Sequence, residues 1–323
     1  MVNDNKILIT GGSGFIGTNI LKKIKNNSSN IFATYYSNKN FYKVDNVQYI
    51  KSNLENKNEC KKICKDIDIV VMCAANSSGA AVMEKTPLVH MTPNLIMNAN
   101  MLEAAYEANV KKFIFISSNT VYPHVNFAVK EEDAKFDFFE KYYVVGWMKR
   151  FTEILCEIYS KKIKNKMITI IVRPGNLYGP HDKFDLEKSK VIPALIRRVI
   201  EKQNPLTVWG DGNDIKDFLF ISDFSDIIIK IINTVDYHDV FNIASGKGIT
   251  IKEILSEIID LEKVFDIEIE YDSTKPTMIP IRLIDITKAK NLLGFSPKFD
   301  LRKGLELTIN WYKNYYDYNK NSL

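Results

Sequence analysis

The chain has 323 residues, of which 46% are hydrophobic and 26% charged, a globular composition with room for two domains. Its net charge of +5 agrees equally with an anionic ligand and with many solvated lysines. No Lys/Arg block interleaved with aromatics is present, which argues against a nucleic-acid surface. No apolar run reaches about 20 residues, which argues against a membrane span.

Strands and helices are expected to alternate through the first half. Continuous or near-continuous apolar runs predict strands at Lys6–Thr10, Ile31–Tyr36, Val47–Leu54, Asp66–Ala75, Lys111–Ser117 and Met167–Pro174. Helical patterns lie between them at Phe15–Asn27, Glu55–Cys64, Pro93–Ala108 and Val144–Ser160. Short connections and doubly covered strands predict an α/β fold, a Rossmann-like doubly wound parallel sheet.

The pattern changes after Pro174. Helices are expected at Val191–Lys202, Ile249–Asp260 and Leu301–Tyr316, a short strand at Leu206–Gly212, and a strand followed by a helix at Lys216–Thr234. We therefore predict a dinucleotide-binding domain over 1–173, with a return segment near 218–243, and a smaller α/β substrate domain over 174–323. A cleft between them is the natural ligand site.

The first strand runs into a glycine-rich turn, "TGGSGFIG" (Thr10–Gly17). Gly11 permits a tight turn, Gly14 a close approach of backbone to a pyrophosphate, and Gly17 close helix–strand packing. The helix that follows offers amides at Phe15 and Ile16 and a partial positive charge to an anion. The stretch predicts dinucleotide binding.

The sequence signal that distinguishes NAD from NADP is weaker. NAD-binding folds usually carry an acidic residue after the second strand, whereas here Tyr36, Ser37 and Lys39 stand without an acid or an arginine. Ser37 and Lys39 suit a 2′-phosphate or a solvated loop equally well. We expect NAD and leave NADP open.

Cysteines and histidines show no metal pattern. The four cysteines are Cys60, Cys64, Cys73 and Cys156, and the four histidines are scattered. No second pair at ligand spacing accompanies Cys60 and Cys64, so no metal site is expected. Lys6 leads directly into a strand without the pattern of a secretory signal. A reducing cytoplasm is the expected location.

Four further motifs resemble the NAD-dependent epimerase/dehydratase family of extended short-chain dehydrogenases, which act on nucleotide sugars. They are "CAANSSG" (Cys73–Gly79), "PNLIMNANMLEAA" with Asn94, "SSNTVYP" (Ser117–Pro123) and "RPGNLYGP" (Arg173–Pro180). The likeness spans nearly the whole chain. It implies cofactor contacts at Asn53, Leu54, Ala74, Ala75, Asn94 and Lys149, and a catalytic serine at Ser118.

A later stretch, "KVIPALIRRVIEK…LTVWGDGNDIKDFLFISD", is similar to the GDP-L-fucose synthase branch. That likeness implies a GDP-sugar partner, bound by Val191, Arg198, Trp209 and Lys216. Asn176 in "RPGNLYGP" is a further expected substrate contact. The segment "KPTMIPIRLIDITKAKNLLGFSP" (Lys275–Pro297) resembles the family's C-terminal element, which implies another diphosphate contact at Arg282. Lys216 stands where the branch carries an arginine, so it keeps the charge but not the bidentate fork. Arg198 could equally be a solvated helix residue.

The catalytic positions depart from the family in three places. Thr120 and Lys190 stand where fucose synthases carry the cysteine and histidine of epimerisation, and neither titrates near neutrality. Val145 stands where the family carries the tyrosine that takes the sugar's proton, four residues before Lys149. Epimerisation is therefore expected to be lost, while a redox step remains.

Several groups are candidates to replace the missing tyrosine. Tyr142 lies on nearly the same helical face and would reach the site only if the helix begins after it. Tyr122, His124 and Thr120 are alternatives from the facing loop, and Ser118 could act through a bound water. Losing a general base typically costs a factor of about 10²–10⁴ in rate.

Two hypotheses about function follow. The first is an enzyme that oxidises a GDP-sugar at C4, because Lys149, Ser118 and the GDP-sugar segment are retained. The second is a relative that has lost its base and senses NAD(P). The resemblance also implies a homodimer or higher homo-oligomer through the helix that carries Lys149. The apolar stretch "FTEILCEIY" (Phe151–Tyr159) agrees equally with such an interface and with a place in the core.

Overall fold

The computed structural model describes residues 5–24, 30–38, 41–77, 86, 88–186 and 189–320. A seven-stranded parallel sheet lies at its centre, in the order β11-β7-β5-β4-β1-β2-β3. The strands are β1 (Ile7–Thr10), β2 (Ile31–Tyr35), β3 (Gln48–Lys51), β4 (Ile69–Met72), β5 (Lys112–Ile116), β7 (Ile168–Pro174) and β11 (Asp239–Ile243). The predicted α/β, doubly wound parallel sheet is confirmed.

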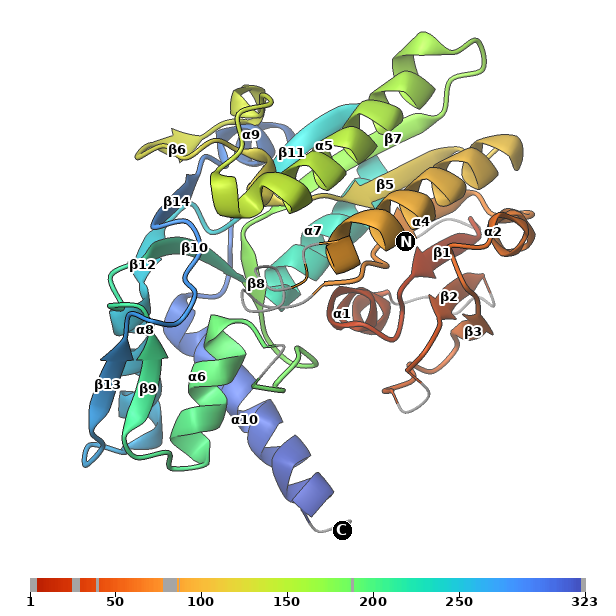
Figure 1. Cartoon of the computed structure of the whole chain (residues 1–323). Helices are drawn as coiled ribbons and strands as arrows, with labels where there is room; N and C mark the ends of the chain where they lie inside the picture. Colours follow the sequence, from red (N-terminus) through yellow and green to blue (C-terminus); the bar gives the residue numbers. More distant parts are fainter. Residues whose placement is uncertain are drawn as a thin grey trace.

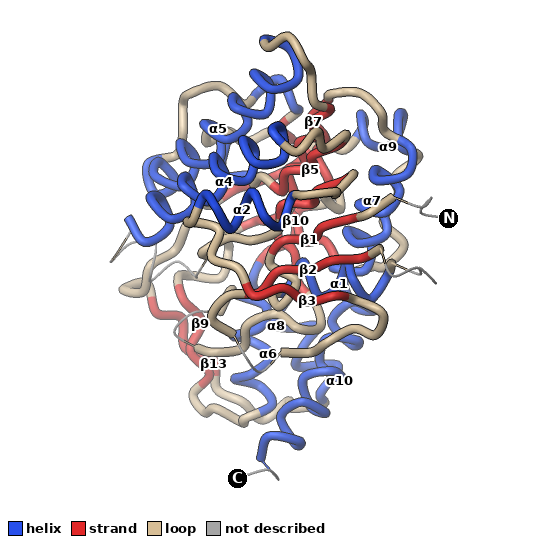
Figure 2. Tube along the Cα trace, turned by 90° about the vertical axis from the view of Figure 1, so that its right-hand side faces the viewer, coloured by secondary structure: helices blue, strands red, loops and turns tan. Residues whose placement is uncertain are grey.

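Helices cover both faces of this sheet (Figures 1 and 2). On one side lie α2 (Lys57–Cys64), α4 (Leu88–Glu107) and α5 (Tyr143–Glu157), and on the other α1 (Phe15–Lys23) and α7 (Ile221–Thr234). Ile7 and Ile9 belong to the core cluster shared with α1 and α7, and Leu8 to the cluster shared with α2 and α4. Both faces are buried, which explains the unbroken apolar runs of the strands.

A second group of elements lies to the left and lower left of this sheet in Figure 1. A five-stranded sheet has the order β12-β10-β14-β6, with β8 also paired to β10, and β13 pairs with β9. These strands are β6 (Ala128–Val129), β8 (Asn176–Tyr178), β9 (Leu206–Trp209), β10 (Ile215–Phe220), β12 (Gly248–Thr250), β13 (Ile269–Asp272) and β14 (Ile281–Ile284). The helices are α6 (Val191–Ile200), α8 (Ile251–Glu262), α9 (Thr287–Leu293) and α10 (Leu301–Lys320).

The chain passes between the two sheets more than once. β11, from the predicted return segment, pairs with β7 in the central sheet, whereas β6, from the first half, pairs with β14. The boundary at residue 173 stays a prediction. Within the described ranges, no helix is long and apolar enough to cross a membrane.

The helix predicted to begin at Pro93 begins earlier, at Leu88. Proline lacks the amide that would donate to the carbonyl four residues back, which is that of Val89. That carbonyl accepts a hydrogen bond from Asn76 Nδ2 instead, at 3.0 Å. The loop after β4 thus satisfies the group that Pro93 leaves open, and the helix continues through it.

Candidate active site

The glycine-rich turn after β1 forms a tight cradle. Gly11 has a φ of +65°, and a Cβ on Gly17 would lie 2.3 Å from the Gly11 carbonyl oxygen, so only glycine lets α1 come this close. No side chain caps α1, so its first amides, at Phe15, Ile16 and Gly17, lack intrahelical acceptors. With Gly14 at the N-cap, this arrangement fits a cofactor diphosphate.

The loop after β4 is held beside the cradle. Thr10 Oγ1 accepts a hydrogen bond from the Ala74 amide at 3.1 Å, and Ala75 follows as an exposed residue. Asn94 of α4 uses both ends of its amide on Asn76, with Oδ1 accepting from N at 2.8 Å and Nδ2 donating to O at 2.9 Å. Asn94 therefore braces the loop predicted to meet the nicotinamide ribose.

The remaining predicted cofactor residues follow β2 and β3. Tyr36 and Ser37 are exposed at the end of β2, whereas Lys39 lies outside the described residues, as do the last two residues of the "CAANSSG" motif. Asn53 Oδ1 accepts from the Glu55 amide at 3.1 Å, and the Leu54 side chain lies in the core. Because β2 and β3 are neighbouring parallel strands, the segments that follow them lie at the same edge of the sheet. The contacts of these segments with the cofactor stay predictions.

The strand end predicted to be catalytic lies between β5 and α5. Ser118 Oγ accepts a hydrogen bond from the Thr120 amide at 3.1 Å. Lys149 Nζ donates to the Ile116 carbonyl at 2.8 Å and lies 4.9 Å from the centre of the Phe115 ring. The structure thus holds the Lys149 ammonium at the end of the strand that leads into Ser118.

The electrostatic surroundings of Lys149 are unusual for a lysine. Burial lowers its pKa to about 8, while the charges of Glu153 and Cys73 act in the opposite direction. Among the described residues, Lys149 forms no ion pair. It is therefore an amine whose free form is accessible near physiological pH.

Tyr142, the first candidate to replace the tyrosine, precedes α5, because the helix begins at Tyr143. The condition set for its reaching the site is therefore met. Its side chain, however, is buried, which raises its pKa to about 12, with Arg282 and the backbone of Ile279 beside it. Within the described chain no hydrogen bond joins Tyr142 to Ser118 or Lys149, and its catalytic role stays a prediction.

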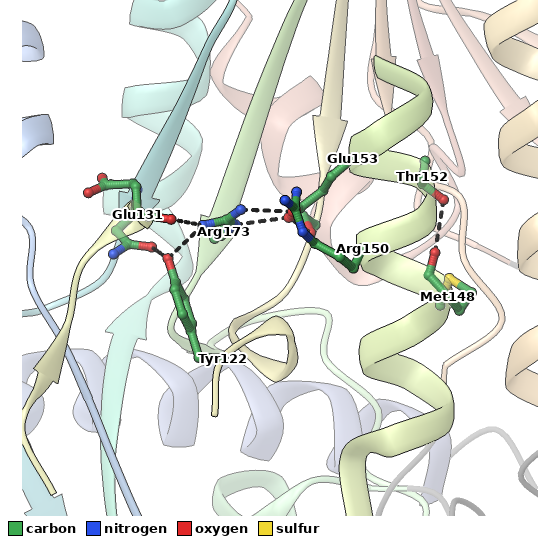
Figure 3. A network of polar contacts seen from close by, with 9 residues as sticks. Tyr122, Glu131, Met148, Arg150, Thr152, Glu153 and Arg173 are labelled. Atoms are coloured by element: carbon green, nitrogen blue, oxygen red, sulfur yellow. Dashed lines mark hydrogen bonds and ion pairs between the residues drawn. The ribbon is translucent and has the colours of Figure 1, made fainter. Parts of the chain in front are cut away.

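A buried ionic network ties α5 to the central sheet, as Figure 3 shows. Glu153 accepts from Arg173 Nε and Nη2 at 2.9 and 2.8 Å, from Ser117 Oγ at 2.6 Å and from Arg150 Nη1 at 3.1 Å. Arg173 Nη1 also donates to the Tyr122 hydroxyl at 3.0 Å. Glu153 was not among the site residues predicted from the sequence; its signal was a carboxylate one helical turn after Lys149.

Two predicted substrate cations are brought side by side. Lys216 of β10 and Arg282 of β14 are register partners in parallel strands. Lys216 pairs with Asp214 at 3.0 Å. Arg282 is 1% exposed and donates to the carbonyls of Tyr122 and Pro123, but its Nε has no partner within the described residues. A buried guanidinium without a carboxylate partner is suited to an anion.

The other predicted substrate residues form a second group near α6. Arg198 donates to the Thr207 carbonyl at 2.7 Å and lies 5.9 Å from the centre of the Trp209 ring. Val191 begins α6 and is half-buried. Asn176 lies on β8, where its Nδ2 donates to the Asp217 carbonyl at 3.0 Å.

The start of α6 approaches the cofactor cradle. Lys190, the N-cap of α6, places its Nζ 5.6 Å from the centre of the Phe15 ring. Lys183 also reaches across, and its Nζ donates to the Ser77 carbonyl at 2.7 Å. The predicted cofactor and substrate segments therefore meet in the fold. No three His, Cys, Asp or Glu side chains gather as a metal site in the part of the chain that the structure describes.

Comparison with known proteins agrees with this geometry. The model of the NAD dependent epimerase/dehydratase family matches residues 7–244. GDP-L-fucose synthase 1 of Arabidopsis thaliana is 28% identical over 95% of this chain and 93% of its own length. dTDP-4-dehydro-6-deoxy-D-allose reductase of Streptomyces bikiniensis is 25% identical over 96% of both.

Among solved structures, UDP-glucuronic acid 4-epimerase from Bacillus cereus, in complex with UDP-glucuronic acid and NAD, superposes with a TM-score of 0.83. The two chains are 26% identical, and the match covers 96% of this chain and 99% of the other. The likeness therefore extends through both sheets.

Proposed function

The chain belongs to the NAD-dependent epimerase/dehydratase family, and from that premise we propose that it is a dehydrogenase that oxidises a GDP-sugar at C4 to the 4-keto sugar. One observation carries the proposal most of all. Lys216 and Arg282 lie in register on neighbouring strands, and Arg282 also holds the loop that follows Ser118. A diphosphate bound by these cations would be connected directly to the catalytic strand end.

Charge supports a nucleotide diphosphate at this point. Lys216 and Arg282 carry two positive charges, whereas Asp214 is the one carboxylate paired with them among the described residues. Burial lowers the pKa of Arg282 to about 10, and the neighbouring tyrosines act against this. The net positive charge is buried, so an anionic ligand would relieve its desolvation.

Each remaining residue has a task in this proposal. Gly11, Gly14 and Gly17 would hold the cofactor diphosphate, and NAD, when bound, supplies the hydride acceptor. Ser118 would orient the C4 hydroxyl. Lys149 would remain at the strand end through its bond to Ile116.

Simple oxidation is favoured over epimerisation. Thr120 stands at the position of the epimerising cysteine, and its hydroxyl is buried without a partner in the described residues. Lys190 stands at the position of the histidine and is exposed. Neither side chain is a thiol or an imidazole, the groups that suit a proton shuttle near neutrality.

Among GDP-sugars we propose GDP-D-glycero-manno-heptose as the substrate. The reaction would take place in the cytoplasm and would supply a precursor for capsule or other surface polysaccharide. The support is the resemblance to the GDP-sugar branch together with the loss of the epimerising groups. Purified protein with NAD and this sugar should produce NADH absorbance and a product lighter by two hydrogens in mass spectrometry. Absence of any redox change with every GDP-sugar, in both directions, would contradict the proposal.

Val145 favours one competing function, a protein that binds NAD(P) and turns nothing over. The variant Val145→Tyr separates the two. An enzyme should show turnover in the parent chain and a changed rate in the variant. A sensor should bind cofactor in both forms and remain inactive in both. A ketoreductase would instead consume NADH with a 4-keto GDP-sugar.

We also propose a homodimer through α4 and α5. These helices pack together and present exposed apolar side chains, among them Ile96 at 39% and Phe151 at 46% exposed. Large apolar side chains left exposed are a feature of interaction sites when they gather on one surface. Phe151→Glu should convert the dimer to a monomer in light scattering, whereas Phe265→Glu, 71% exposed on another surface, should not.

A further inference from the structure

The proposed oxidation needs a proton acceptor that Val145 cannot supply, and the structure removes two of the alternatives. The Tyr122 hydroxyl is fully buried, donates to Asn242 Oδ1 at 2.5 Å and accepts from Arg173 at 3.0 Å. Burial raises its pKa to about 12. His124 is exposed on the surface, with its ring against Phe139. Both side chains have structural contacts instead.

The hydroxyl groups at the strand end are also unsuited. Ser118 Oγ accepts a hydrogen bond from the Thr120 amide, and its own O–H can still orient a substrate hydroxyl. As an aliphatic hydroxyl, however, it does not bind a proton near neutrality. Thr120 Oγ1 is buried, and its backbone packs against Gly146, where a Cβ would lie 2.9 Å from the Thr120 carbonyl oxygen. Tyr142 lies against Ile279 and Arg282.

Lys149 remains, and its placement suits the task. It lies four residues after Val145, about 6 Å along the same helical face. Because valine is much smaller than tyrosine, no phenol stands between the Lys149 amine and a hydroxyl held by Ser118. Only one carbonyl, that of Ile116, binds Nζ among the described residues.

We propose that Lys149, as the free amine, accepts the hydroxyl proton that a tyrosine takes in related enzymes. This inference rests on the proposed oxidation. The C4 carbon gives its hydrogen and both C–H electrons to NAD, the O–H bond breaks, and the proton forms the third N–H bond of the ammonium. The carbon–oxygen bond becomes double, so atoms and charges balance. In the reverse reaction the ammonium returns the proton.

The groups around Lys149 set the pH at which this occurs. Glu153 on α5, Cys73 after β4 and the face of the Phe115 ring favour the charged form, and burial disfavours it more strongly. Glu153 is itself committed to Arg173 and Arg150, which weakens its hold on the ammonium. The amine is therefore free to a useful extent near pH 8.

The first experiment is the pH dependence of kcat/KM for oxidation. In the parent chain kcat/KM should rise tenfold per pH unit and level off near pH 8, because the free amine is the reactive form. Lys149→Arg retains the positive charge and a hydrogen-bond donor for the Ile116 carbonyl. Because arginine stays protonated, it has no free base form that could accept the proton of the substrate. The substitution should lower kcat by about 10²–10⁴ with the dissociation constant for NAD unchanged within a few-fold.

A double-mutant comparison then separates proton transfer from positioning. Val145→Tyr supplies a phenol, whereas Val145→Phe supplies the same ring without the hydroxyl. Lys149→Arg should cost far less in the Val145→Tyr background than in the Val145→Phe background. Equal costs in both backgrounds, or a Lys149→Arg variant with normal kcat, would overturn the proposal.

A third measurement does not depend on turnover or on the mutants' activity. With ¹³C-labelled lysine, the Lys149 signal is identified in the parent chain by its absence in Lys149→Arg and titrated by NMR with NAD bound. A midpoint near pH 8 supports the proposal, and a midpoint above about pH 10, the ordinary lysine range, overturns it. If the midpoint is near 8 but no GDP-sugar reacts, the proposed substrate is at fault and not the amine.

Discussion

Removing the Glu153 carboxylate should be among the most destabilising single changes in the chain. Glu153 is 0% exposed and Arg173 is 2% exposed, and they share two hydrogen bonds. In Glu153→Ala the Arg173 guanidinium stays buried, and its Nε and Nη2 groups lose their carboxylate partner. Breaking a buried pair from one side costs about 3–5 kcal/mol, and the freed Ser117 hydroxyl adds about 1 kcal/mol.

The matched variants test whether the cost comes from the unpaired charge. Glu153→Leu combined with Arg173→Met removes both charges, and it should lie within about 2 kcal/mol of the parent. The two single changes should therefore be non-additive by at least about 2 kcal/mol. Glu157→Ala, one turn further along α5, breaks an exposed pair with Lys161 and should cost less than about 1 kcal/mol.

Urea unfolding followed by circular dichroism measures these differences, provided that the slope with urea is unchanged among the variants. A Glu153→Ala loss below about 1 kcal/mol would refute the reasoning that links burial to cost in this pair. Additive single changes would refute it as well, because they would show that Glu153 and Arg173 act independently.

Three further predictions test the cradle, the thiols and the pH response. Gly17→Ala should weaken NAD binding at least about tenfold and reduce the thermal stabilisation by NAD accordingly, because its Cβ would meet the Gly11 carbonyl; normal NAD stabilisation would contradict this. Burial raises the pKa of Cys60, Cys64 and Cys73 to about 12 and also raises that of Cys156. Iodoacetamide near pH 8 should therefore label no thiol in the folded protein and four in the unfolded protein, and mass spectrometry counts the labels. Burial, and then Lys22, lowers the pKa of His181 to about 4, so its contribution to stability is present above about pH 6.5 and lost as the pH falls towards 4. His181→Asn, which tolerates the φ of +69°, should flatten that loss in urea titrations, and an unchanged pH dependence would argue against it.

Most of the central sheet could be predicted from the sequence because its strands are buried on both faces. The predicted strand at Ile31–Tyr36 and the observed β2 differ by one residue. β6, in contrast, has two residues, Ala128–Val129, and carries no local pattern. It exists because β14 offers it a partner more than 150 residues later, and β14 was recognised only as part of a family motif.

The candidate site divides in the same way. Gly11 and Gly17 lie in a short glycine motif that local spacing identifies, whereas Ser118 and Lys149 were expected from the resemblance to the family. Two partners of Glu153, Arg173 on β7 and Ser117 directly after β5, lie 20 and 36 residues away in the sequence, and only the packed sheet brings them to it. The pairing of Lys216 with Arg282 likewise depends on strand register, which no local pattern specifies.

The exchange of strands between the two sheets has a mechanical consequence. The chain leaves the central sheet for β6, returns to β7, leaves again through β8 and β10, returns to β11 and departs through β12. Hinge motion between two domains requires every segment that connects them to lie near a single hinge axis. Here the connecting segments leave the central sheet at several strands, so the two sheets should move as one rigid body. Ligands would then gain access through the surface loops that border the cradle, whose rearrangement requires none of the strands to separate.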